Sequence, residues 1–422
     1  MDGKVGVIGL DSISARKKEA DPSFWETLRG FHQELLKLEK SPDALKIRRL
    51  ADARNLTLPT WFLGSVRASE KLSAKHPLGR RLIASTEAAE MASRREVARI
   101  RFSLLKSPIN GPAFFPACGA GLDLLHFHDL HPKTPLIFSD IDVDHLRMAN
   151  SNMKIAAGEG KGTPLCHDAS RLPFKCTSGY TFIDPARRKG NEKFSVKNME
   201  PSLSDSLALT GSTELFQIKL PAGFDPERHL PSSIDPANWQ WDWIQYGRDV
   251  VECVGTLQPS KSHSRGAHVI DSVSGQTDSW VTTSIGDSHQ YEFRDISTDS
   301  IVLIPEASLK PSCLTQAWAK DHDLYPTSYP GIFISETPGS TPLGKRFKTH
   351  GKSRPSIRDI TRQFSGSKKS RLEPLSEGDR FPRDLQKSIE SHNRNIPKET
   401  VTLNILFLTL GKKKEVLILE RI

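Results

Sequence analysis

The sequence predicts an α/β protein with a doubly wound parallel sheet, preceded by helices and followed by a smaller α+β domain. Apolar residues recur at helical spacing between residues 21 and 106. From residue 111, short apolar runs that end in polar residues alternate with helical patterns, as in parallel strands joined by helical crossovers. The chain closes with two apolar runs joined by a glycine and three lysines, which predicts a terminal hairpin. We therefore predict three domains, at residues 1–106, 107–300 and 301–422.

Length and composition indicate a soluble, multidomain protein. The chain has 422 residues, too many for one ordinary hydrophobic core, and 36% of them are hydrophobic and 26% charged. Its five cysteines form no CxxC pair, so we expect a reducing, cytoplasmic compartment and no metal site. No apolar run approaches the length of a membrane span, so no membrane contact is expected.

Positive charge is concentrated at both ends of the chain. Residues 1–106 contain 21 Lys and Arg against 13 Asp and Glu, and residues 345–422 contain 19 against 9. The middle of the chain contains the remaining 19 against 28, so its net charge is −9. Basic ends around an acidic centre favour ends that contact a polyanion, although solvated faces would give the same counts.

Three helices are predicted in residues 21–106. The first begins at Pro22, and Asp43 caps the second. The third is expected to begin after Ser85 or Thr86 and to continue to Leu105. Four arginines on this third helix are expected to form a basic surface, either solvated or in contact with nucleic-acid phosphates: Arg94, Arg95, Arg99 and Arg101.

The first three predicted strands of the sheet carry candidate ligand-binding residues at their ends. In the segment 113–123 (AFFPACGAGLD), Gly119 and Gly121 let the backbone turn tightly and approach a ligand at a helix N-terminus. The second strand ends on Asp140, 21 residues after Gly119, where a carboxylate can accept both hydroxyls of a ribose. The third strand ends on Asp168, where an acidic side chain can accept a hydrogen bond from the amine of adenine.

The fourth predicted strand ends at Asp184 and Pro185, because proline has no N–H to donate and restricts the residue before it. A basic cluster of Arg187, Arg188 and Lys189 follows directly. Taken alone, Asp184 and Pro185 followed by basic residues would be an Asp-Pro turn with solvated arginines. Three successive strands that end on aspartates after a glycine turn are a stronger signal, because open α/β sheets bind ligands at the carboxyl ends of their strands.

This series of motifs resembles the class I S-adenosylmethionine-dependent methyltransferases, whose core is a Rossmann-like doubly wound sheet. More narrowly, it resembles the bacterial group in which that core is followed by a THUMP-like domain. In that group the fourth strand characteristically ends in DPARR, found here at residues 184–188. The segments 86–101 (TEAAEMASRREVARIR), 215–225 (LFQIKLPAGFD) and 302–310 (VLIPEASLK) also resemble it, so the match extends from about residue 78 to the end.

The resemblance implies S-adenosylmethionine as the cofactor and RNA as the substrate, because THUMP-type domains bind RNA, usually tRNA. A base of tRNA or rRNA would be methylated. The implied site residues are Cys118, Gly119, Gly121, Asp123, Asp140 and Asp168 for the cofactor, Asp184 and Pro185 for catalysis, and Arg187, Arg188 and Lys219 for the substrate.

Two alternatives remain open at this point. Phe115 stands where the family has an acidic residue, and Leu122 replaces a glycine. These departures would suit a catalytically decayed methyltransferase that serves as an RNA-binding or scaffold protein. A nucleotide-dependent oxidoreductase would use the same strand ends, but the incomplete glycine fingerprint and the acidic residue on the third strand speak against it.

Three further patterns are predicted to be structural. His126 and His128 are two residues apart on a predicted helix, so they face different directions and make no metal pair. Tryptophans at positions 239, 241 and 243 alternate as on a strand, which favours packing over base stacking. Residues 258–290 are predicted to form polar hairpins that close the sheet.

Overall fold

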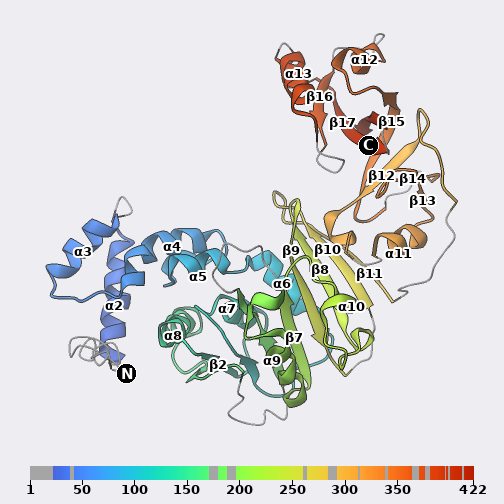
Figure 1. Cartoon of the computed structure of the whole chain (residues 1–422). Helices are drawn as coiled ribbons and strands as arrows, with labels where there is room; N and C mark the ends of the chain where they lie inside the picture. The colour runs from blue at the N-terminus through green and yellow to red at the C-terminus, as the bar shows by residue number, and fades with distance from the viewer. Residues whose placement is uncertain are drawn as a thin grey trace, which may run out of the picture. The chain divides into compact units, whose positions relative to one another are not determined.

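The computed structural model describes residues 22–38, 42–170, 179–187, 196–259, 264–283, 292–311, 314–337, 341–363, 370–375, 381–394, 396–397, 400–410 and 413–422 (Figure 1). It divides into two compact units. The first unit consists of Met1–Pro221, Pro231–Trp239 and Val254–Lys261. The second consists of Ala222–Leu230, Gln240–Cys253 and Ser262–Ile422. The domain boundaries after residues 106 and 300 stay a prediction of the sequence.

The first unit begins with helices. They are α2 (Pro22–Leu35), α3 (Ala44–Asp52), α4 (Ser65–Ser73), α5 (Thr86–Met91) and α6 (Arg95–Ser103), with the short 3₁₀ turns η1 (Thr60–Gly64) and η2 (Gly79–Arg81) among them. Asp43 caps α3 as predicted, because its side chain accepts a hydrogen bond of 2.8 Å from the N–H of Lys46. Leu28, Phe31 and Leu35 of α2 are buried, which confirms the helical spacing read from the sequence.

The third predicted helix is in fact two helices, α5 and α6. The backbone is extended at Ala92 (ψ 136°) and Arg94 (ψ 150°). The ammonium group of Lys75 donates to the carbonyls of Ala89, Glu90 and Ala92 at 2.6–2.9 Å, so a side chain from outside the helix satisfies the end of α5. The single-helix prediction was wrong because its sequence carries no sign of this long-range cap.

Five parallel strands form the first half of a nine-stranded sheet. They are β1 (Ala113–Phe115), β2 (Leu136–Asp140), β3 (Thr163–Cys166), β4 (Tyr180–Ile183) and β7 (Leu215–Leu220). Their order is β3-β2-β1-β4-β7, so the strand order reverses between β1 and β4. Ligands of open α/β sheets bind at this switch point, outside the carboxyl ends of the strands. The predicted parallel α/β sheet is therefore confirmed.

The remaining strands of this sheet are β8 (Gln240–Tyr246), β9 (Asp249–Leu257), β10 (Ser264–Ile270) and β11 (Thr277–Thr282), in the order β11-β10-β8-β9. β10 runs parallel to β8 and antiparallel to β11. The antiparallel pair confirms one of the hairpins predicted for 258–290, of which 260–263 and 284–290 lie outside the described residues. The three tryptophans are at most 3% exposed, so the packing prediction is also confirmed.

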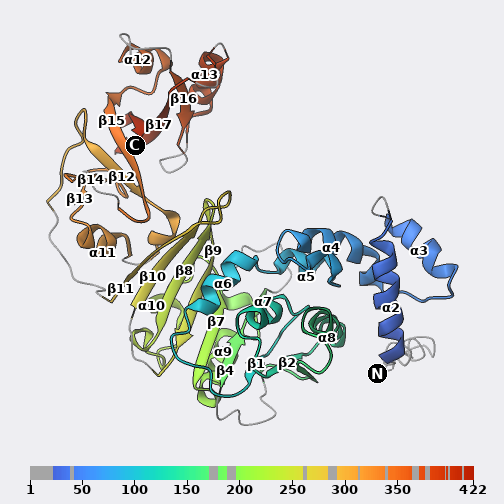
Figure 2. The same cartoon turned by 180° about the vertical axis from the view of Figure 1, so that it is seen from behind.

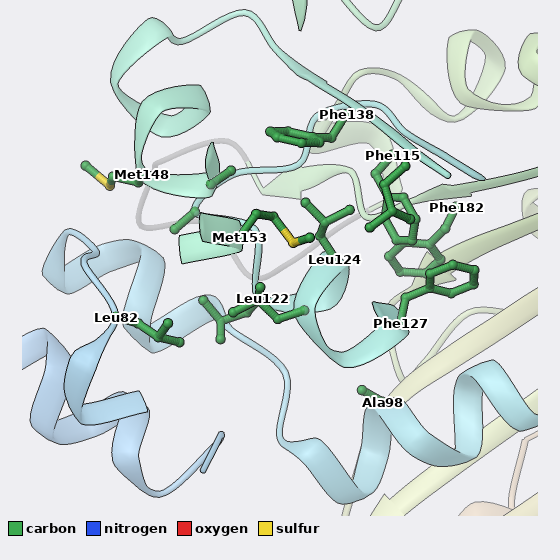
Figure 3. Packing of buried hydrophobic residues seen from close by; sticks show 14 of the residues in the cluster. Leu82, Ala98, Phe115, Leu122, Leu124, Phe127, Phe138, Met148, Met153 and Phe182 are labelled. Atoms are coloured by element: carbon green, nitrogen blue, oxygen red, sulfur yellow. The ribbon is translucent and has the colours of Figure 1, made fainter. Parts of the chain in front are cut away.

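An aromatic cluster holds the core of the first unit together. The rings of Phe115 on β1 and Phe182 on β4 lie 5.7 Å apart, and Phe102 of α6 lies 5.2 Å from Phe182. Figure 3 shows Phe115, Phe127 and Phe182 side by side, with Ala98 of α6 nearby. Helix α6 is therefore part of the same core as the sheet.

The second unit contains a separate seven-stranded sheet with the order β13-β14-β12-β15-β18-β17-β16. Its strands are β12 (Ile301–Pro305), β13 (Tyr325–Pro326), β14 (Phe333–Ser335), β15 (Gly344–Ser353), β16 (Arg371–Pro374), β17 (Thr402–Leu410) and β18 (Lys413–Arg421). The helices of this part are α11 (Leu314–Asp321), α12 (Ile357–Arg362) and α13 (Arg383–Asn393), seen from behind in Figure 2. The antiparallel pair β17–β18 confirms the predicted terminal hairpin. In the described parts of the chain, no helix is long and apolar enough to cross a membrane.

Candidate functional site

A cavity of about 640 Å³ lies at the carboxyl ends of β1, β2 and β4, within the first unit. This volume is in the usual range for small-molecule sites. Its walls come from the glycine turn after β1, the ends of β2 and β4, the segment that follows β3, helix α5, and the residues that lead into α9 (Leu203–Ala208). The predicted residues that line it are Cys118, Gly119, Gly121, Asp123, Asp140, Asp168, Asp184 and Pro185.

The two glycines of the turn have different structural roles. Both have positive φ, +55° at Gly119 and +82° at Gly121, which residues with a Cβ adopt at a cost. A Cβ on Gly119 would meet nothing within 4 Å, so this residue leaves open space beside the cavity. A Cβ on Gly121 would lie 2.9 Å from that of Ala149, so this glycine allows close packing of α7 (Leu122–Leu130) on α8 (Val143–Ala157).

Asp140 ends β2 and holds the glycine turn in place. Its Oδ2 accepts from the N–H of Gly119 at 2.8 Å, and its Oδ1 accepts from the N–H of Asp142 at 2.9 Å. Asp140 is only 7% exposed, and this burial raises the pKa of its carboxyl group despite the two hydrogen bonds. Each oxygen keeps a second lone pair, so the carboxylate can still accept from a ligand in the cavity.

Two more predicted cofactor residues lie on either side of Asp140. Asp168 follows β3 by two residues, and its Oδ1 accepts from the N–H and the hydroxyl of Ser170 at 2.9 and 2.8 Å. Cys118 is half-buried beside the glycine turn. Burial, and then the charge of Asp140, raise the pKa of the Cys118 thiol well above its usual range, so this thiol stays protonated at neutral pH and is a poor nucleophile.

Asp184 and Lys219 form an ion pair that the strand register explains. Ile183 of β4 is paired with Ile218 of β7, so the next residues on the two parallel strands are neighbours. Lys219 Nζ lies 2.6 Å from Asp184 Oδ2 and 3.2 Å from the hydroxyl oxygen of Ser93. Lys219 is not among the cavity-lining residues, so it reaches Asp184 from behind the wall. Burial raises the pKa of Asp184 and outweighs the opposite effect of Lys219.

A second ion pair lies on the other side of Ser93. The guanidinium of Arg101 donates to Asp123 Oδ1 at 2.7 Å and to Ser93 Oγ at 2.8 Å. Arg101 is fully buried, with its guanidinium 5.0 Å from the ring centre of Phe182. Burial opposes ionisation of Asp123, but Arg101 and then Lys219 outweigh it and hold the pKa of Asp123 well below its usual range. The predicted basic surface was therefore wrong for Arg101, whose partner lies 22 residues away in sequence.

These two ion pairs form one charge network, Asp184–Lys219–Ser93–Arg101–Asp123, which is fully buried at Arg101 and partly exposed at Asp184. It joins the end of β4 to the first turn of α7 through the break between α5 and α6. The network fixes two of the predicted site carboxylates relative to each other. Arg101 contacts Asp123 directly and Ser93 contacts Lys219, and neither Ser93 nor Arg101 is among the cavity-lining residues.

Several residues at the site were missed by the sequence reasoning. Helix α5 contributes Glu87 and Met91, and the segment before α9 contributes Glu200. Ile141, directly after Asp140, is 70% exposed and lines the cavity. No motif spacing connects α5 with the sheet. The position of an isoleucine directly after a strand-end aspartate was visible in the sequence, and it could have indicated an apolar contact for a ligand.

The basic residues after Asp184 are only partly described. The backbone of β5 (Ala186–Arg187) pairs with β6 (Met199–Glu200), so the segment after Pro185 runs beside the segment that leads into α9. Arg188 and Lys189, predicted together with Arg187 as a basic cluster, lie outside the described residues.

The cavity wall is strongly acidic. Among its described residues are eight carboxylates and no lysine or arginine: Glu87, Asp123, Asp140, Asp142, Asp168, Asp184, Glu200 and Asp205. Arg101 and Lys219 neutralise two of the eight from behind. By the formal charge of its described residues, this wall favours a cationic ligand over a polyphosphate.

No protein-family model matches the chain, and no curated protein matches it. Among solved structures, the putative methyltransferase from Porphyromonas gingivalis W83 is similar over 95% of this chain and 98% of that chain, with a TM-score of 0.69 and 15% identity. The human methyltransferase 10 domain containing protein covers 45% of this chain and 97% of its own, with a TM-score of 0.36 and 10% identity. The 23S rRNA methyltransferase ErmE covers 40% and 69%, with a TM-score of 0.29 and 10% identity.

The fold assignment rests on the first of these similarities, which extends along almost the whole of both chains. This chain has a Rossmann-like, largely parallel α/β sheet and shares its fold with the Porphyromonas gingivalis protein.

Proposed function

We propose that this chain is an S-adenosylmethionine-dependent methyltransferase that acts on a base of tRNA or rRNA. The observation that carries the proposal is the acidic cavity at the switch point of the sheet, with aspartates at or just after the ends of β2, β3 and β4. S-adenosylmethionine carries a sulfonium and an ammonium group, so its net positive charge suits this wall. A dinucleotide carries a pyrophosphate, which the same wall would repel, and this disfavours the oxidoreductase alternative.

The residues fit the parts of the cofactor. The free lone pairs of Asp140 would accept from the ribose hydroxyls, and Asp168 would accept from the adenine amine. The exposed side chain of Ile141 would pack on the flat adenine ring, since an apolar group left in water at a cavity is stabilised by a ligand that covers it. The N–H groups at the start of α7 would face the cofactor's own carboxylate.

Asp184 is the residue we assign to the acceptor base. When bound, the cofactor supplies an electrophilic methyl group on a sulfonium. The protein then has to orient the acceptor, exclude water and remove a proton from the attacking atom. The raised pKa of Asp184 makes its carboxylate a better proton acceptor than an ordinary surface aspartate. Lys219 is fixed behind it and would position the carboxylate rather than touch the substrate, which differs from the substrate-binding role first assigned to it.

RNA as the acceptor is supported by the charge of the chain rather than by the cavity. The segments 1–106 and 345–422 carry net charges of +8 and +10 around a centre of −9. Arg187 and Arg188, directly after Asp184 and Pro185 in sequence, would bind a phosphate next to the target base.

The departures at Phe115 and Leu122 are compatible with an active enzyme. Phe115 is 2% exposed and packs against the rings of Phe127, Tyr180 and Phe182, so it belongs to the core while also lining the cavity. Leu122 is 5% exposed, and α7 still begins at this position, directly after the glycine turn. The decayed-scaffold alternative therefore has to be decided by activity.

The test is transfer of a radioactive methyl group from S-adenosylmethionine to bulk tRNA and rRNA by the full chain. Asp184→Asn keeps the size of the side chain and removes its charge, so it should lower the single-turnover rate by roughly 10²–10⁴. Asp249→Asn, at an exposed position outside the cavity, is the control and should keep the rate. A normal rate in Asp184→Asn would contradict the catalytic assignment. Cofactor binding without transfer to any RNA would support the scaffold instead.

A further inference from the structure

Two histidines and an aspartate come together at α7, one helical turn beyond the cavity residue Asp123. His126 and Asp129 are three residues apart on α7, so their side chains lie on one face of this helix. His76, between α4 and η2, lies against the same face, with its Nε2 3.7 Å from Asp129 Oδ2 and its ring centre 5.0 Å from that of His126. One potential ligand atom from each of the three lies within 4.8 Å of the others.

The burial of the two histidines points to a missing ligand. His76 is 3% exposed and His126 is 1% exposed, whereas the side chain of Asp129 is 34% exposed. The Nε2 atom of His76 and the Nδ1 atom of His126 are buried without a hydrogen-bond partner. Buried polar atoms are nearly always satisfied, so two such atoms in one cluster call for an explanation.

The neighbours of the cluster orient two of its three members. The Nε2 of His126 lies 3.3 Å from the carbonyl oxygen of Ser93 and donates to it, which leaves Nδ1 as a bare acceptor. Arg95 lies 3.5 Å from Asp129 and holds the carboxylate beside the histidines. In the metal-free form, His76 Nδ1 accepts from the N–H of Leu78 at 3.1 Å, so a metal at Nε2 requires the other tautomer of His76 and the loss of this one bond.

We propose that His76, His126 and Asp129 bind a divalent transition-metal ion, with zinc as the first candidate. Two imidazole nitrogens and one carboxylate are a ligand set that zinc accepts, whereas calcium and magnesium require oxygen ligands. The partly exposed side of Asp129 leaves a fourth position for water. From the sequence we expected no metal site here, because His126 and His128 face different directions on the helix. His76 lies 50 residues upstream of His126, and helical spacing cannot connect the two.

The site would stabilise a particular contact within the first unit. It would tie α7, which starts at the glycine turn, to the segment between α4 and η2. Metal binding would therefore raise the melting temperature of the folded chain, because the unfolded chain does not bring the three ligands together.

The experiment measures zinc bound to the full chain, prepared without a polyhistidine tag. The protein is incubated with Zn²⁺, desalted, and analysed for metal by mass spectrometry, and its melting temperature is recorded with Zn²⁺ and with a chelator. We expect about one zinc per chain and a higher melting temperature with Zn²⁺. Asp129→Ala, at a partly exposed position that should still fold, should weaken zinc binding by about tenfold or more. His76→Asn should abolish it, and His128→Asn on the same helix as His126 should retain it.

The proposal is overturned if the folded, unmodified chain retains no zinc and shows no change in melting temperature. It is equally overturned if Asp129→Ala and His76→Asn bind as much zinc as His128→Asn. Because Asp129→Ala removes no buried group, a folding failure of His76→Asn leaves the test intact.

Discussion

Arg101→Met tests whether the buried charge network holds the site together. The substitution keeps much of the apolar volume but leaves Asp123 without its guanidinium donor, while the Ser93 hydroxyl keeps only Lys219 as a cationic neighbour. Removing one partner of a buried ion pair costs about 3–5 kcal/mol. For a unit of this size, each kcal/mol lowers the melting temperature by about 2–4 °C, so the expected decrease is about 6–20 °C.

Arg99→Met is the matched control, because Arg99 lies on the same helix and is exposed. An exposed arginine should contribute less than about 0.5 kcal/mol. Adding Asp123→Leu to Arg101→Met removes the orphaned carboxylate as well and should recover part of the stability, since apolar replacements of buried ion pairs are often neutral. Thermal melts followed by circular dichroism measure all four proteins. Equal melting temperatures for Arg101→Met and Arg99→Met would refute the network and restore the solvated surface that the sequence first indicated.

Three further predictions follow from the geometry. Gly121→Ala should lower the melting temperature more than Gly119→Ala, because only Gly121 packs against α8 at a distance that excludes a Cβ, and equal losses would contradict this. Burial, with nearby like charges, lowers the pKa of Lys75 from 10.5 to about 8, so between these pH values the unfolded chain binds more protons and stability rises with pH. The melting temperature of the unmodified chain minus that of Lys75→Met should therefore increase from pH 8 to pH 10. A difference that does not change with pH would mean that the pKa of Lys75 is not lowered. If RNA binds the basic C-terminal part, replacing the exposed Arg358 and Lys387 by Glu should weaken RNA binding and make it less dependent on salt. Cofactor affinity should not change. Titrations with RNA and with cofactor at several salt concentrations measure both.

Local sequence signals were enough to predict the sheet and the positions of its terminal aspartates. The apolar run before Asp184 ends at a proline, and the glycine turn precedes a helix, so both boundaries follow from backbone chemistry within a few residues. The third strand ends two residues earlier than expected, at Cys166, because strand ends depend on pairing with the neighbouring strand.

The side chains behind the cavity wall could not be predicted in the same way. Arg101 has the spacing of a surface arginine, and its burial depends on Asp123 and on the aromatic rings of other elements. The break between α5 and α6 depends on Lys75, which is distant in sequence from the carbonyls it caps. Each of these contacts is set by tertiary packing, which periodicity and propensity do not encode.

Calorimetry with S-adenosylmethionine and with NAD tests the central claim, that the acidic cavity is a cofactor site for a cation. We expect S-adenosylmethionine to bind the unmodified chain with a dissociation constant in the micromolar range, equivalent to about −8 kcal/mol. Asp140→Asn should weaken that binding at least about tenfold, since a charge-assisted hydrogen bond contributes about 1.5–3 kcal/mol. NAD should give no heat. Binding of NAD, or no heat with S-adenosylmethionine at high concentration, would contradict the account.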